Sequence, residues 1–164
     1  GRIGVIGTAA TLRSGAYGRA IRGIRPDAHT FGNACPLFVP LVENGFIQPD
    51  NEITIKVAQT YLQPMIENEV DTLILGCTHY PLIRSTVGRI MGEEVSLVNP
   101  AYETARALKR LLKEKGLESE QKPGLGTELY RFFVSDAADK FQRFANSILS
   151  YGILSAKVIH IEEF

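Results

Sequence analysis

The chain has 164 residues, of which 45% are hydrophobic, and its formal net charge at pH 7 is zero. This length suits one domain or two small ones, with enough apolar residues for a core. The neutral balance of charges gives no electrostatic case for binding nucleic acid or an anionic membrane, and no apolar run approaches the ~18 residues that span a bilayer. Cys35 and Cys77 lack the spacing of metal ligands, and we expect them to be reduced thiols of a cytoplasmic protein.

The first part of the chain alternates short apolar runs with amphipathic stretches. Arg2–Ile6 and His29–Cys35 are predicted strands. Thr8 is suited to cap one helix between them, which carries Leu12, Ala16, Tyr17, Ala20 and Ile21 on one face. The segment after the second strand contains prolines and a glycine, which predict a loop, and Glu43 lies in it. Apolar residues then recur at helical spacing over residues 51–69, which predicts a long helix.

A chemically unusual tripeptide follows the next predicted strand. The apolar run Thr72–Leu75 reaches a glycine, and Cys77, Thr78 and His79 come directly afterwards. Because Pro81 suits the first position of a helix, these three residues are predicted to form a strand-to-helix turn. In open α/β sheets, ligands bind at the carboxyl ends of such strands. A helix N-terminus nearby would also favour the thiolate form of the cysteine.

Structural interpretations of the same residues remain open at this point. A lone cysteine after a strand also suits a small buried hydrophobic residue, and a lone histidine suits a hydrogen-bonded polar position. Thr8 is equally suited to a simple helix cap. Glu43 in a predicted loop is by default a solvated carboxylate, and Cys35 is predicted to be buried packing.

The last part of the chain continues the alternation. Val95–Val98 is a predicted strand, and Asn99 followed by proline is typical of a helix start. The buried stripe of this helix is predicted to consist of Ala101, Ala105, Leu108 and Leu112. We predict a strand over Glu128–Ser135, a helix capped by Asp136, and a final strand over Lys157–Ile161. Strands that alternate with helices throughout predict an α/β fold, with a mainly parallel sheet flanked by helices.

Three stretches together resemble one enzyme family. Gly76–Leu82 reads Gly-Cys-Thr-His-Tyr-Pro-Leu and is similar to the second catalytic motif of the glutamate racemases. Gly4–Thr11 and Ala34–Glu43 agree with the same family, and the resemblance stays in register to the C-terminus. Related aspartate racemases typically carry an acidic residue where His79 stands. The resemblance therefore favours glutamate over aspartate as the substrate.

The resemblance also implies a domain organisation. Members of the family have two α/β lobes with the active site between them. Residues 1–98 are expected to form the complete middle lobe, which carries the Cys-Thr-His motif. Residues 99–164 are expected to be the C-terminal portion of the other lobe, incomplete without a segment that precedes residue 1. Unpaired strand edges and uncovered apolar faces would then favour a homo-oligomer formed through 99–164.

The family's chemistry implies catalytic roles for three residues. Glutamate racemases interconvert L- and D-glutamate without a cofactor, with one cysteine on each face of the substrate Cα, and they supply D-glutamate for peptidoglycan. The resemblance implies that Cys77 is one acid/base, that His79 assists it, and that Glu43 assists in catalysis. The other cysteine belongs to a Cys-Asn-Thr motif that this sequence lacks. The isolated chain is therefore expected to be inactive.

The resemblance implies substrate-binding roles as well. Thr78 and His79 are expected to bind glutamate together with Thr8 and Thr11, and no metal or cofactor is expected. Two alternatives remain. The first is an aspartate racemase-like enzyme, and the second is a catalytically silent α/β fragment that associates with itself.

Overall fold

The computed structural model describes residues 1–119, 130–149, 152, 155–160 and 162. The chain divides into two compact units, Gly1–Gly116 and Leu117–Phe164. The first unit contains the whole Cys-Thr-His turn. The lobe boundary that the resemblance implies at residue 98 stays a prediction.

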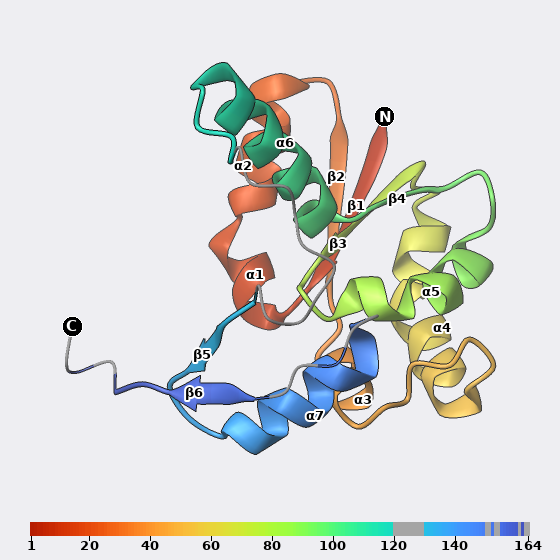
Figure 1. The fold of residues 1–164 in the computed structure, drawn as a ribbon. Coiled ribbons are helices and arrows are strands. Elements are labelled where there is room, and N and C mark those ends of the chain that lie inside the picture. The colour runs from red at the N-terminus through yellow and green to blue at the C-terminus, as the bar shows by residue number, and fades with distance from the viewer. Residues whose placement is uncertain (120–129, 150–151, 153–154, 161, 163–164) are drawn as a thin grey trace. The chain divides into compact units, whose positions relative to one another are not determined.

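A four-stranded parallel sheet forms the centre of the first unit (Figure 1), in the order β2-β1-β3-β4. Its strands are β1 (Arg2–Gly7), β2 (His29–Ala34), β3 (Thr72–Gly76) and β4 (Ser96–Val98). The prediction of a parallel α/β sheet is confirmed. Gly7 pairs with both Ala34 and Gly76, so β1, β2 and β3 end at the same level. Whatever follows these three strands therefore lies along one edge of the sheet.

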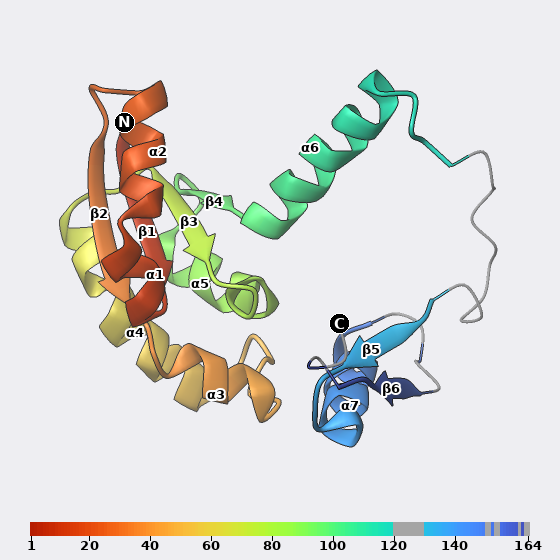
Figure 2. The ribbon, with the colours of Figure 1, turned by 90° about the vertical axis from the view of Figure 1, so that its left-hand side faces the viewer.

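Helices connect and cover the strands, as Figures 1 and 2 show. They are α1 (Ala9–Ser14), α2 (Ala16–Ile24), α3 (Phe38–Glu43), α4 (Glu52–Glu67), η1 (Tyr80–Ile83) and α5 (Arg84–Met91). A further helix, α6 (Pro100–Glu114), follows β4. A Cβ at Gly4 would meet Met65 of α4, whereas a Cβ at Gly76 would meet Tyr17 of α2. Gly4 and Gly76 point to opposite faces, so helices cover the sheet on both sides. The core includes Ile6, Leu73 and Leu75, with Leu62 and Met65 of α4, all at most 1% exposed.

Two local predictions were wrong. The helix expected after Thr8 breaks at Gly15, whose φ of 62° ends α1 and separates it from α2. The loop expected around Glu43 contains α3. This short helix forms because Phe38 and Val42, one turn apart, are both buried.

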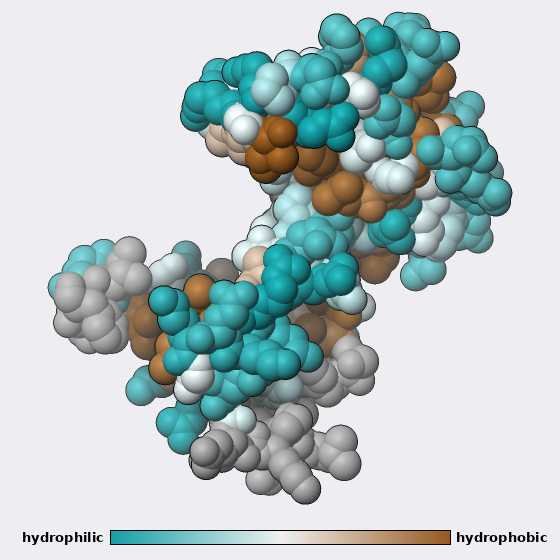
Figure 3. Space-filling model, turned by 90° about the horizontal axis from the view of Figure 1, so that it is seen from above, coloured by the Kyte–Doolittle hydropathy of each residue, from teal (hydrophilic) through white to brown (hydrophobic). Residues whose placement is uncertain are grey.

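The apolar stripe predicted on α6 is not buried. Within the first unit no residue of α6 is buried, and Tyr102, Leu108 and Leu111 are 48–63% exposed. Figure 3 shows hydrophobic residues on the surface, among hydrophilic ones. The periodicity of the sequence identified an apolar face on α6, but periodicity does not say which other element covers that face.

The second unit has a parallel pair, β5 (Phe132–Val134) and β6 (Ala156–Val158), and the helix α7 (Ala138–Ile148). β5 lies within the strand predicted over Glu128–Ser135, and β6 begins at Ala156, one residue before the strand predicted over Lys157–Ile161. Residues 128, 129 and 161 of these predicted strands lie outside the described residues. Asp136 is not the N-cap of α7. That position belongs to Ala137, whose N–H donates to Asp136 Oδ1 over 2.6 Å.

None of the described helices combines the length and apolar character needed to cross a membrane.

Candidate active site

The turn after β3 carries Cys77, Thr78 and His79, as the sequence predicted. A side chain on Gly76 would place its Cβ 2.9 Å from the Ile6 carbonyl oxygen and 3.1 Å from the Tyr17 ring. Glycine is therefore the residue that lets the strand end this close to its neighbours. Cys77 is half-buried, so its thiol is neither sealed in the core nor fully in solvent.

A thiol, an imidazole and a carboxylate are aligned at this turn. Cys77 Sγ lies 3.9 Å from His79 Nδ1, and the opposite ring nitrogen, Nε2, lies 3.3 Å from Glu43 Oε1. A carboxylate accepts from Nε2–H, which leaves Nδ1 of the neutral ring as an acceptor. The side chains of His79 and Glu43 are 23% and 35% exposed, so solvent screens this pair only in part. The arrangement can move a proton between sulfur and nitrogen.

Thr78 lies beside the same imidazole, with its Oγ1 3.3 Å from His79 Nδ1. The thiol and the hydroxyl therefore share one ring nitrogen as a neighbour. The Thr78 side chain is exposed, which makes its hydroxyl and backbone reachable from solvent.

The structure brings Glu43 to this site from α3. The sequence placed it in a loop, and its partner His79 is far along the chain. α3 instead ends at Glu43, and α3 packs beside η1, the helical turn that directly follows His79. Nothing in the local pattern around residue 43 predicted its contact with His79, because that contact depends on the packing of two separate connections.

Thr8 and Thr11 lie in the turn after β1. Thr8 caps α1, since its Oγ1 accepts from the Thr11 N–H over 3.3 Å, and the two hydroxyls share a hydrogen bond of 3.0 Å. The capping prediction is confirmed. Because Gly7 pairs with Gly76, the Thr8 turn and the Cys77 turn begin at the same level on neighbouring strands. Both threonines are half-buried at this edge.

The second thiol of the chain has no access to this chemistry. Cys35 is fully buried, as predicted, and this burial raises the pKa of its thiol to about 12. It stays protonated at physiological pH and is inert as a nucleophile or base. Its backbone carbonyl accepts a 2.8 Å hydrogen bond from the buried hydroxyl of Tyr80. No role was predicted for Tyr80 from the sequence, although its position directly after His79 is a signal that the sequence contains.

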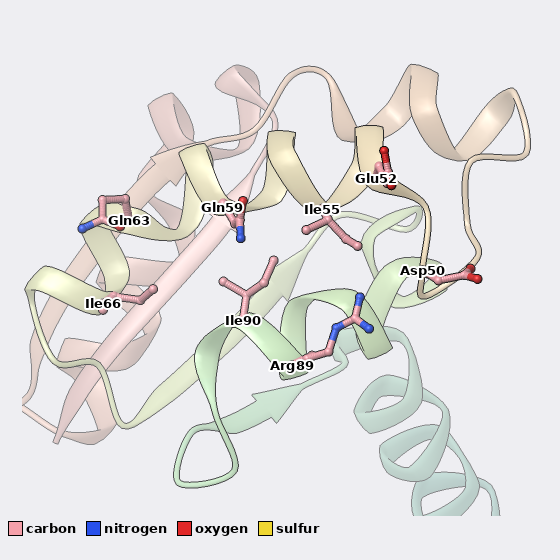
Figure 4. Close-up of a pocket in the computed structure, with 8 residues that line it drawn as sticks. All are labelled: Asp50, Glu52, Ile55, Gln59, Gln63, Ile66, Arg89 and Ile90. Carbon is pink, nitrogen blue, oxygen red and sulfur yellow. The ribbon is translucent and has the colours of Figure 1, made fainter.

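A separate groove of about 750 Å³ lies between α4 and α5 (Figure 4). Ile55 and Gln59 of α4 point toward Ile90 of α5 there, and Arg89 lies near the end that carries Asp50. No cysteine or histidine lines this groove, so it is separate from the site formed by Cys77 and His79. In the described part of the chain, no three His, Cys, Asp or Glu side chains gather as a metal site would require.

Comparison with curated proteins finds glutamate racemases. The chain is 46% identical over 149 residues to the glutamate racemase of Geobacter metallireducens, and this match covers 91% of the chain and 53% of that protein. It is 41% identical over 152 residues to that of Desulforudis audaxviator, covering 91% of the chain and 55% of that protein. The chain thus spans about half the length of the curated relatives it matches. No protein-family model matches the chain.

Solved structures give the same family. Glutamate racemase from Francisella tularensis, in complex with D-glutamate, aligns with a TM-score of 0.86 and 32% identity over 99% of this chain and 59% of its own. Glutamate racemase RacE1 from Bacillus anthracis aligns with a TM-score of 0.87 and 33% identity over 98% of this chain and 57% of its own. This coverage agrees with the prediction that the chain corresponds to the C-terminal part of such an enzyme. By sequence and by fold, the chain belongs to the glutamate racemase family.

Proposed function

We propose that this chain carries one half of the active site of a cofactor-independent glutamate racemase. The observation that carries the proposal is the alignment of Cys77, His79 and Glu43 at the carboxyl end of β3, with distances of 3.9 and 3.3 Å. Similarity to glutamate racemases over about 90% of the chain supports the substrate. So does the D-glutamate bound to the Francisella tularensis enzyme.

In this proposal, Cys77 exchanges a proton with one face of the substrate Cα. As thiolate, Cys77 takes the Cα proton and becomes a thiol, and a thiol on the opposite face gives its proton to the carbanion. The reverse direction uses the same two groups with exchanged roles. His79 Nδ1 holds the proton that leaves the Cys77 thiol, and Glu43 fixes the ring through Nε2. No step requires an electron sink other than the substrate's own carboxylate.

The second acid/base has to come from outside this chain. The sequence has two cysteines, and Cys35 is buried with its pKa raised to about 12. Cys77 alone can remove a proton from one enantiomer and return it to the same face. We therefore propose that the 164 residues by themselves do not interconvert the enantiomers.

Thr8, Thr11, Thr78 and His79 are proposed to bind the substrate. Hydroxyls and backbone N–H groups of two turns at one sheet edge suit the carboxylates of an acidic amino acid.

We also propose that residues 1–98 form the middle lobe of a racemase and that residues 99–164 form part of its other lobe. The exposed apolar face of α6 would be covered in a homo-oligomer or by the remainder of a racemase. The product, D-glutamate, supplies peptidoglycan synthesis, and the enzyme acts in the cytoplasm.

A chimera tests the proposal directly. This chain replaces the matching 53% of the Geobacter metallireducens glutamate racemase, and L-glutamate is converted in D₂O without added cofactor. We expect D-glutamate with deuterium at Cα, and a rate at least ~10²-fold lower for Cys77→Ala. Cys35→Ala is the matched control and should retain activity. Conversion of aspartate in preference to glutamate, or full activity of Cys77→Ala, would refute the proposal.

A further inference from the structure

The hydroxyl of Tyr80 connects two turns at the carboxyl edge of the sheet. Tyr80 lies directly after His79, is fully buried, and donates a 2.8 Å hydrogen bond to the carbonyl of Cys35, the residue after β2. Desolvation by burial raises the pKa of Tyr80, so the phenol stays protonated and remains a donor. The Cys35 N–H in turn donates to the Gly7 carbonyl over 2.9 Å. The Tyr80 hydroxyl is thereby linked to the ends of β1 and β2.

The ring of Tyr80 also holds the start of α3. Phe38, the first residue of α3, is fully buried and packs edge-on against Tyr80 with ring centroids 5.1 Å apart and planes at 90°. Tyr61 of α4 packs on Phe38 in the same manner, at 5.3 Å and 88°. Tyr80 therefore contacts both ends of the short link from Cys35 to Phe38.

The other end of α3 carries Glu43. The helix has six residues, one of them Pro40, and no side chain caps its N-terminus. A helix this short is not stable by itself, so its position depends on what it packs against. Glu43 reaches His79 over 3.3 Å only while α3 is docked. Both ends of α3 therefore meet the segment His79–Tyr80.

We infer that Tyr80 is a positioning residue, which holds α3 through the Cys35 carbonyl and the Phe38 ring so that Glu43 reaches His79. This role rests on the proposed function, in which Glu43 and His79 assist Cys77. Tyr80→Phe keeps the ring and removes the hydroxyl, and the Cys35 carbonyl then retains only the 3.2 Å bond from the Phe38 N–H. Loss of one hydrogen bond should lower the ratio of docked to undocked α3 about fivefold.

The experiment uses the full 164-residue chain, and its readouts do not need turnover. Hydrogen exchange of the Leu41 and Asn44 amides, which close α3, should accelerate about fivefold in Tyr80→Phe. The imidazole ¹⁵N resonances of His79 should move toward those of Glu43→Gln. In the Glu43→Gln background, Tyr80→Phe should leave these resonances where they are, because Tyr80 acts through Glu43.

Tyr61→Phe is the matched control. Tyr61 packs on the same Phe38, but its hydroxyl accepts a longer bond, 3.4 Å, from the Leu37 N–H, so its loss should shift the His79 resonances less than Tyr80→Phe does. Should Tyr80→Phe fail to fold, Phe38→Leu weakens the same link and predicts the same direction of shift. Unchanged His79 resonances in Tyr80→Phe, or an equal shift in the Glu43→Gln background, would overturn the inference. Failure of the chimera to racemise would instead refute the proposed function.

Discussion

Iodoacetamide at pH 8 should modify Cys77 and spare Cys35 in the folded chain. Thiolate is the reactive form, and with its pKa raised to about 12, Cys35 is ionised to about one part in 10⁴ at pH 8. A thiol with the ordinary pKa of ~8.5 is about one quarter ionised at that pH. The low degree of ionisation alone should therefore slow the alkylation of Cys35 by a factor of about 10³ relative to an ordinary thiol, and its complete burial should slow the alkylation further.

The assay is a time course of alkylation, quenched and digested, with the two cysteine peptides followed by mass spectrometry. In guanidinium chloride the two peptides should react at similar rates, which controls for local sequence effects. Cys77→Ser should remove the fast phase, and Cys35→Ala should leave it unchanged. Rates for the two native thiols within about tenfold of each other would show that the contrast in burial and ionisation is wrong.

Three further substitutions, one control substitution and one pH dependence test the packing of the first unit. Thr86→Val should leave the free energy of unfolding unchanged or raise it, because Thr86 Oγ1 is buried without a partner among the described residues. Thr54→Val should lower the free energy of unfolding by about 1–2 kcal/mol in urea titrations, because the Thr54 hydroxyl donates a 2.7 Å hydrogen bond to the Phe46 carbonyl. Gly76→Ala should destabilise by about 1–3 kcal/mol, since its Cβ would lie 2.9 Å from a backbone carbonyl oxygen. Gly23→Ala, which meets nothing within 4 Å, should not destabilise. Stability should fall as pH rises from 9.0 toward about 12, because the folded state keeps the Cys35 proton that the unfolded chain releases, and Cys35→Ala should show a shallower decline.

The turn that carries Cys77 was predictable because its signals are local. An apolar run, a glycine, and a proline at a helix start lie within ten residues of one another, and each constrains the backbone by itself. The parallel sheet followed from the alternation of such runs with helical patterns. The burial of Cys35 followed from the same logic, as a small apolar residue at the end of a strand.

Long-range packing explains what the sequence did not reveal. α3 is helical because Phe38 meets rings from residues 61 and 80, and no window around residue 38 contains either partner. The Glu43–His79 pair depends on that helix and was missed for the same reason. The exposed apolar face of α6 has a related explanation. Its periodicity predicted a buried stripe, but burial requires a packing partner, which periodicity does not identify.

The central claim is that Cys77 serves one face of the substrate Cα. L- and D-glutamate are incubated separately in D₂O with the Cys77→Ala chimera, and deuterium at Cα and configuration are measured together. We expect interconversion to be lost, with deuterium entering only the enantiomer whose Cα hydrogen faces the remaining cysteine. Interconversion at the rate of the unsubstituted chimera would contradict the account.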